Sequence, residues 1–146
     1  MRPLLVVPPK LSRGDRVAVV SPSFAAPGAF PAVHEQSMRR LRDELGLQPV
    51  EYPTTRWLDA PVRDRAADLM AAFGDPSIKA VLATIGGDDQ LVVLPHLDPS
   101  VVTAHPKAFP GYSDNTQPGR AWSAGSVPRG RGRHGQGQQL SAPDLG

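Results

Sequence analysis

Residues 16–113 alternate between short β-branched runs and longer segments whose apolar residues share one helical face. The order β-α-β-α-β-α-β requires crossover connections, which make neighbouring strands parallel and place helices on both faces of the sheet. The sequence therefore predicts an α/β fold built on a parallel sheet. The expected strands are residues 16–23, 48–52, 79–85 and 107–113, and the expected helices lie within residues 31–46, 60–76 and 98–106.

Two of the expected helices carry start and stop signals. Pro31 suits the first turn of a helix, and Gly46 suits its end. The second helix closes at the Gly-Asp-Pro sequence of residues 74–76. The apolar face of the first helix is predicted to consist of Val33, Met38, Leu41 and Leu45, and that of the second of Val62, Ala66, Leu69, Met70 and Phe73.

Two loops follow strands at the carboxyl edge, where parallel sheets bind ligands. One is SPSF at residues 21–24 and the other is IGGDDQ at residues 85–90. Gly86 and Gly87 allow a sharp turn and a close backbone approach, and a following helix start offers N–H groups to an anion or an oxyanion. We call residues 86–90 the glycine turn. On spacing alone the simpler interpretation is a structural turn in which Asp88 or Asp89 caps the helix.

Three motifs shift that balance: SPS after the first strand, RAADLMAAFGDPSIKAVLATIGGDD at residues 65–89, and PKAFPGYSDNT at residues 106–116. In this order and spacing they resemble the N-terminal domain of the LD-carboxypeptidases, serine peptidases that include the microcin C self-immunity proteins. The resemblance covers about residues 11–116. It implies a cytoplasmic hydrolase, usually a homodimer, with no metal or organic cofactor. Family members cleave an amide bond in L,D-peptides of murein or the acyl-sulfamoyl-adenylate linkage of microcin-type toxins.

The glycine turn of that family has the pattern Gly-Gly-x-x-Ser, in which the serine is the nucleophile, and the resemblance places Gln90 at this position. A glutamine amide is a poor nucleophile, whereas a serine hydroxyl attacks well once a base removes its proton. Ser113 lies in a different motif, and nothing in the sequence places a base beside it. The resemblance implies no complete catalytic set, and the implied oxyanion-binding or ligand-binding residues are Gly86, Gly87, Asp88, Asp89, Ser21, Ser23 and Ser113.

The other two triad residues of the family, a glutamate and a histidine, come from a C-terminal domain with no counterpart in these 146 residues. The histidines of this chain match no catalytic position, and each is expected to be an ordinary surface or half-buried side chain. They are His34, His96, His105 and His134.

The composition changes abruptly after Thr116. Residues 1–116 carry 12 Lys and Arg against 13 Asp and Glu, whereas residues 117–146 carry 4 against 1, with seven glycines and three prolines. We therefore expect an N-terminal α/β domain at residues 1–116 and a disordered basic tail at residues 117–146. A shifted reading frame in GC-rich DNA produces such a switch, so the sequence suggests a truncated gene product.

Three functions stay open at this point. The chain is part of a hydrolase and inactive alone, or it is a binding module in which Gln90 supplies a hydrogen-bond donor and an acceptor to a peptide or nucleotide-like ligand. The third function, nucleic-acid binding through RGRGRH at residues 129–134, ranks last because that cluster lacks repeats and interleaved aromatics. The absence of cysteine excludes disulfides and thiolate metal sites. The short apolar run at the N-terminus predicts neither a signal peptide nor a membrane span.

Overall fold

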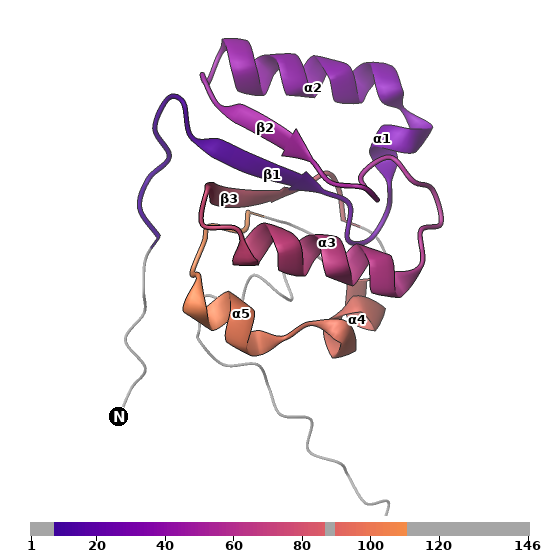
Figure 1. The fold of residues 1–146 in the computed structure, drawn as a ribbon. Coiled ribbons are helices and arrows are strands. Elements are labelled where there is room, and N and C mark those ends of the chain that lie inside the picture. Colours follow the sequence, from indigo (N-terminus) through magenta and orange to yellow (C-terminus); the bar gives the residue numbers. More distant parts are fainter. Residues whose placement is uncertain (1–7, 87–89, 111–146) are drawn as a thin grey trace, which may run out of the picture.

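A parallel sheet forms the middle layer of the molecule (Figure 1). The computed structural model describes residues 8–86 and 90–110. Within them the strands are β1 (Arg16–Val20), β2 (Gln48–Glu51) and β3 (Ile78–Ala83), in the order β2-β1-β3. Both pairings are parallel, and Arg16 at the start of β1 lies opposite Gln48 and Ile78. The predicted parallel sheet is confirmed.

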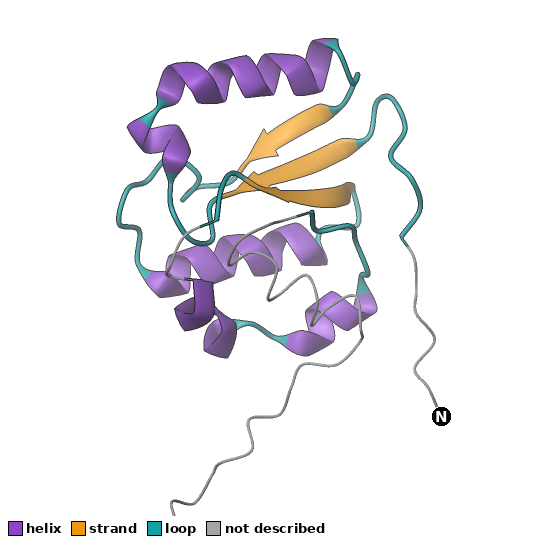
Figure 2. Cartoon of the chain, turned by 180° about the vertical axis from the view of Figure 1, so that it is seen from behind, coloured by secondary structure: helices purple, strands orange, loops and turns teal. Residues whose placement is uncertain are grey.

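Helices cover both faces of this sheet, as predicted (Figures 1 and 2). One face carries α2 (Pro31–Asp43), and the other carries α3 (Val62–Gly74) with α5 (Pro99–Ala104) packed on it. Two short helices lie near the ends of strands: α1 (Ala26–Ala29) in a segment expected to be a loop, and α4 (Gln90–Val93), which continues into the 3-10 turn η1 (Leu94–His96).

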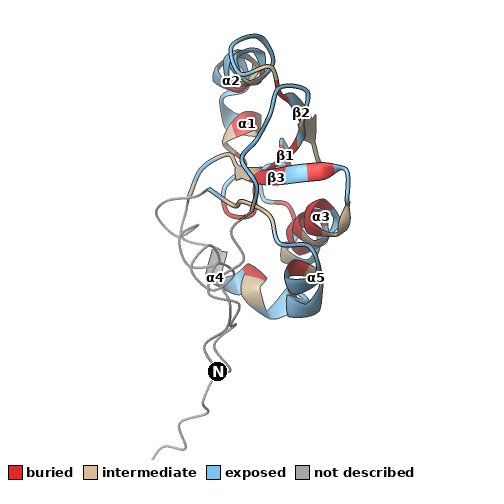
Figure 3. Ribbon diagram, turned by 90° about the vertical axis from the view of Figure 1, so that its left-hand side faces the viewer, coloured by how far each residue is buried: buried red, intermediate tan, exposed pale blue. Residues whose placement is uncertain are grey.

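The core on the α3 face is continuous. Side chains from three elements meet in it, among them Ala18 of β1, Leu69 and Phe73 of α3, and Val81 of β3. All four are almost entirely buried, and Figure 3 shows buried residues along α3 and β3. Because successive strand residues point to opposite faces, the neighbouring Val17 joins a smaller cluster on the α2 face.

The α2 face is less completely covered. Met38 of α2 is buried and Leu41 is half-buried, as the predicted apolar face requires. Val33 and Leu45 were expected on the same buried face, but 62% and 56% of their surfaces are exposed. The helix lies over β2 and β1 and leaves part of its apolar face without a partner among the described residues. The helix ends at Asp43, and Gly46 beyond it adopts the left-handed φ of 67° that favours glycine.

The fourth strand predicted at residues 107–113 is reduced to one bridge within the described residues. Ala108 pairs with Ala80 in parallel, and the Val81 N–H donates to the Ala108 carbonyl at 3.0 Å. In a parallel ladder the next bond from this strand would use the N–H of residue 110, which is proline and has none. Pro110 therefore removes the bond that would follow the bridge, and the pairing of residues 111–113 lies outside the described residues.

Candidate functional site

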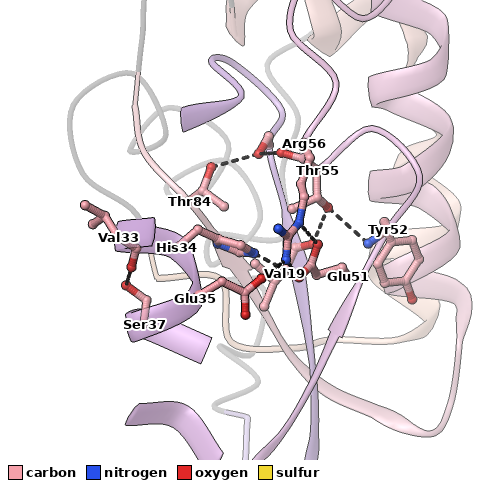
Figure 4. A network of polar contacts seen from close by, with 11 residues as sticks. Val19, Val33, His34, Glu35, Ser37, Glu51, Tyr52, Thr55, Arg56 and Thr84 are labelled. Atoms are coloured by element: carbon pink, nitrogen blue, oxygen red, sulfur yellow. Dashed lines mark hydrogen bonds and ion pairs between the residues drawn. The ribbon is translucent and has the colours of Figure 1, made fainter. Parts of the chain in front are cut away.

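Hydroxyl groups tie together the segments that leave the three strands at their carboxyl ends (Figure 4). The Ser21 hydroxyl donates to the Thr55 carbonyl at 2.8 Å and lies 2.8 Å from the Thr84 hydroxyl. Since Ser21 has only one hydroxyl proton, Thr84 is the donor of the second bond. Ser21 follows β1, Thr55 follows β2 and Thr84 follows β3, so one serine side chain links all three segments.

Thr55 extends this linkage towards the sheet. Its hydroxyl donates to the Val19 carbonyl at 2.7 Å and accepts from the Tyr52 N–H at 3.0 Å. Thr55 is fully buried and Ser21 is 2% exposed, so both hydroxyls are shielded from water. Because these hydroxyl groups are buried and hydrogen-bonded, they hold the ends of the three strands at a fixed spacing. These strand ends frame the candidate site.

A buried arginine of α3 is hydrogen-bonded to the backbone of the SPSF loop. Arg65 of α3 donates from one terminal nitrogen to the carbonyls of Pro22 and Ser23, at 2.9 and 3.0 Å. The sequence analysis missed this residue, although a signal was available. Arg65 lies four residues before Leu69 and eight before Phe73, which places its charge on the buried face of the helix.

A cluster of charged side chains lies on the α2 side of the same edge (Figure 4). Arg56 donates to both carboxylate oxygens of Glu51, at 2.8 and 2.7 Å, and also pairs with Glu35. His34 Nε2 lies 2.9 Å from Glu51 Oε1. The hydrogen bond from Arg56, together with the one from His34, lowers the pKa of Glu51 to about 2 against the opposing effect of burial.

The cluster was not foreseen from the sequence. His34 was expected to be a lone surface or half-buried histidine, and that expectation is wrong: the residue is buried and bonded to Glu51. His34 is buried, as is Met38 one turn later, whereas the preceding residue Val33 is exposed. The His34 side of α2 therefore faces the interior of the protein. His96 and His105 are exposed, as expected of histidines without a structural role.

Of the glycine turn, the structure describes Gly86 and the backbone of Gln90. Gly86 follows the end of β3, and α4 begins at Gln90. Ser21, Ser23 and Gly86 therefore belong to segments that leave the sheet at one edge. Gly87, Asp88, Asp89 and Ser113 lie outside the described residues, and the ligand-binding roles of all seven candidates stay predictions.

An apolar groove of about 600 Å³ opens beside this edge, between α2 and β3. Its walls are mainly aliphatic and aromatic, and its rim carries His34, Ser37, Arg40 and Glu44. We define the α2–β3 groove by five of its apolar lining residues: Phe30, Val33, Leu45, Leu82 and Ile85. A volume of this size is in the range of small-molecule pockets. A groove of this kind also forms where a face of a sheet is incompletely covered.

Among residues 8–86 and 90–110, no group of three or more His, Cys, Asp or Glu side chains is arranged to hold a metal ion. No helix in that part of the chain has the length and apolar character needed to cross a membrane.

Comparison with known proteins identifies relatives of this chain. The LD-carboxypeptidase N-terminal domain family matches residues 17–122. A probable murein peptide carboxypeptidase of Bacillus subtilis is 35% identical over 113 residues, which are 75% of this chain and 34% of that protein. The microcin C7 self-immunity protein MccF of Escherichia coli is 30% identical over 119 residues, or 78% of this chain and 33% of that protein.

The fold agrees with that of solved relatives. The structure of MccF in complex with aspartyl sulfamoyl adenosine matches with a TM-score of 0.72 and 30% identity, over 79% of this chain and 35% of that one. This chain spans about a third of the length of the curated relatives it matches. The family match over most of the described residues and the shared fold lead to one conclusion: the chain belongs to the LD-carboxypeptidase family and corresponds to its N-terminal domain.

Proposed function

We propose that these 146 residues form the ligand-binding N-terminal part of an LD-carboxypeptidase-type amide hydrolase and do not catalyse hydrolysis by themselves. One observation carries the proposal. Gly86 leaves β3 at the carboxyl edge and Gln90 is the first residue of α4, which is the location that the family uses for its nucleophilic serine. This supports a site that keeps the family's scaffold but carries a different residue at the nucleophile position.

The lack of catalysis follows from what acyl transfer needs. An attacking group, a base that removes its proton and donors for the developing oxyanion must act together. We propose that backbone N–H groups at Gly86 and at the start of α4 serve the third task. Gln90 does not serve the first, and no residue of the 146 matches the family's base or its glutamate.

The ligand follows from the relatives. MccF has been solved with aspartyl sulfamoyl adenosine and with glutamyl sulfamoyl guanosine, and another relative is named as a murein peptide carboxypeptidase. We propose an aminoacyl-nucleotide or an L,D-peptide as the ligand. The family resemblance adds a cytoplasmic location, a homodimeric state, no metal and no organic cofactor to this proposal. We also propose that the N-terminal α/β domain ends at Thr116.

A calorimetric titration with aspartyl sulfamoyl adenosine tests the binding part. We expect the 146-residue chain to bind, and Gly86→Val to weaken binding at least about tenfold because a branched side chain obstructs close backbone approach. Gly74→Ala is the matched control, because its new methyl group would meet only Val101 at an ordinary 3.7 Å, away from the site. Equal affinity of the two variants would contradict a ligand site at the glycine turn.

A hydrolysis assay tests the catalytic part. Gln90→Ser is made in this chain and in a longer protein that adds the C-terminal domain of a close relative. We expect turnover only in the longer serine variant, because only there are nucleophile and base both present. Turnover by the unmodified 146-residue chain, surviving removal of trace peptidase, would refute the proposal. Oxyanion donors and binding alone leave a rate about 10³-fold above that of the uncatalysed reaction, so the assay must resolve slow turnover.

A second function is a binding module that never cleaves its ligand, favoured by the residue type of Gln90. Its amide offers both a donor and an acceptor to a peptide or nucleotide. The extended protein separates the two functions. If Gln90 is a recognition residue, Gln90→Ser weakens binding in both lengths and brings no turnover in either.

A further inference from the structure

Most of the buried polar residues in the described part of the chain gather at one place. Within residues 8–86 and 90–110, seven polar or charged residues are buried, and six of them belong to segments at the carboxyl edge of the sheet or are hydrogen-bonded to these segments. The six are Ser21, Ser23, Thr54, Thr55, Arg65 and Asp68. Burying polar groups lowers stability unless they are hydrogen-bonded, so the pairing of this set decides what it does.

Asp68 of α3 is hydrogen-bonded to the segment that follows β2. Its Oδ2 atom accepts from the Thr54 N–H and from the Thr54 hydroxyl, both at 2.7 Å. Thr54 is 2% exposed and Asp68 is 7% exposed, so water does not compete for these bonds. Hydrogen bonds to a carboxylate are stronger than those between neutral groups. The segment after β2 is therefore attached to α3 at Thr54.

Together with the bonds of Ser21 and Arg65, these contacts close a ring. Asp68 binds Thr54, and the carbonyl of the next residue, Thr55, accepts from Ser21. The two carbonyls that follow Ser21 accept from Arg65, which lies three residues before Asp68 on α3. The ring thus runs from α3 through the segment after β2 to the SPSF loop and back to α3. We call this set of bonds the polar ring.

The course of α3 explains why both loops are within its reach. In a parallel sheet the helix between two strands returns from the carboxyl edge to the amino edge, so α3 begins beneath the carboxyl edge (Figure 1). Arg65 and Asp68 lie in the first half of α3, and positions three apart share one face of a helix. One face of this helix therefore presents a donor to the SPSF loop and an acceptor to the segment after β2.

We propose that Arg65 and Asp68 are positioning residues of the candidate site. Through the polar ring they hold the SPSF loop and the segment after β2 as one unit, so that releasing either loop loosens both. A fully bonded buried network rigidifies one arrangement, and a ligand that meets a rigid site does not have to order it first. The inference rests on the proposed function in one respect: the ligand whose affinity the ring controls is the one proposed above.

Amide hydrogen exchange in the full chain tests the coupling without any ligand. Arg65→Met removes the donor to the SPSF loop, and we expect the Trp57 N–H on the other side of the ring, bonded to the Thr54 carbonyl at 3.1 Å, to respond. Its exchange should accelerate at least about tenfold more than that of Ala18 in β1, where exchange requires global unfolding.

Ile78→Val is the matched control for that experiment. Ile78 is buried at the start of β3, away from the carboxyl edge, and its truncation lowers global stability without touching the polar ring. The Trp57 N–H of this variant should exchange as in wild type. Exchange of Trp57 in Arg65→Met that accelerates no more than that of Ala18 would mean that the two loops open independently, and would overturn the inference.

Calorimetric titration with aspartyl sulfamoyl adenosine tests the effect on the site. Asp68→Ala is expected to weaken binding at least about tenfold, because the segment after β2 loses its attachment to α3. Asp68→Asn is the conservative variant, and binding within about threefold of wild type is expected, because its amide oxygen can still accept both bonds from Thr54. Ile78→Val should bind as wild type does. Equal affinity of Asp68→Ala and wild type, or an equal loss in Asp68→Asn and Asp68→Ala, would overturn the inference.

Thr54→Val replaces Asp68→Ala if that variant does not fold. It removes the hydroxyl bond to Asp68 and keeps the N–H bond, so binding should weaken by a smaller factor, about threefold. Unchanged affinity in Thr54→Val would then overturn the inference. A wild-type chain that does not bind aspartyl sulfamoyl adenosine would refute the proposed ligand, and the exchange of Trp57 in Arg65→Met would still decide whether the polar ring couples the two loops.

Discussion

The two faces of the sheet differ in how completely they are covered. On the α3 face, Leu69 and Phe73 of the helix meet Ala18 and Val81 of the strands with almost no exposed surface. On the α2 face, Val33 near the start of α2 and Leu45 just beyond its end are exposed along a groove. Amphipathic patterning therefore indicates which residues can be buried, whereas the neighbours that are present decide which of them are buried.

Truncating one leucine on each face should give the largest contrast. Leu69→Ala removes a fully buried side chain from the α3 face, and we expect a loss of about 2–5 kcal/mol of unfolding free energy. Leu45→Ala makes the same chemical change at a 56% exposed position near the C-terminal end of α2, where about 0.5 kcal/mol or less is expected.

Denaturant midpoints at unchanged slope measure both losses. Comparable losses at the two positions would show that the α2 face is as fully packed as the α3 face, and the contrast between the faces would be wrong.

Periodicity predicted the architecture well for physical reasons. The β-branched runs and the helical faces are local patterns, and they gave the three strands, α2, α3 and α5 within a few residues. Strand spacing also placed Ser21, Ser23 and Gly86 at one edge. The helix α1 was missed because its Ala-Pro-Gly-Ala sequence resembles a loop by composition.

The rest depends on contacts between distant segments. The linkage of Ser21 to Thr55 and Thr84 joins residues 34 and 63 positions apart, which no local pattern specifies. The effect of Pro110 depends on whether its nitrogen faces β3 or solvent, and that is known only once the bridge at Ala108 fixes the register. For Arg65 and His34, helical spacing alone indicates that the side chain lies on a buried face of its helix. Their hydrogen-bond partners lie in other segments and could not be predicted in this way.

A pH titration should also distinguish the two faces. The pKa of Glu51 is lowered from 4.5 to about 2 by Arg56 and His34, so its contribution to stability is complete above about pH 4.5 and is lost as the pH falls towards 2. Because Arg56 and Glu35 are exposed, solvent screens this cluster and we expect its contribution to stability to be small.

Unfolding followed from pH 6 to pH 2.5 in wild type and in Glu51→Gln measures that contribution. The two proteins should differ at pH 6 and converge at the acid end. Glu44→Gln is the control, because Glu44 lies in an exposed pair 3.7 Å from Arg40 and should follow the wild-type curve at every pH. A constant difference between Glu51→Gln and wild type would mean that the cluster contributes through packing rather than charge.

Restoring the missing ladder bond should have the smallest effect on stability and would extend the sheet on its incomplete side. Pro110→Val supplies an N–H that can donate to the Val81 carbonyl, a gain of about 0.5–1.5 kcal/mol. Losing the proline stabilises the unfolded chain by about 0.4–1 kcal/mol, so the net gain in stability is expected to be about 0.5 kcal/mol or less.

Amide hydrogen exchange is therefore the better measurement. The new amide at position 110 and the amide of Ala83 should exchange roughly tenfold more slowly than unpaired amides, whereas Val81, already bonded to Ala108, should be unchanged. Unprotected amides at both positions would mean that the chain leaves the β3 edge directly after Ala108.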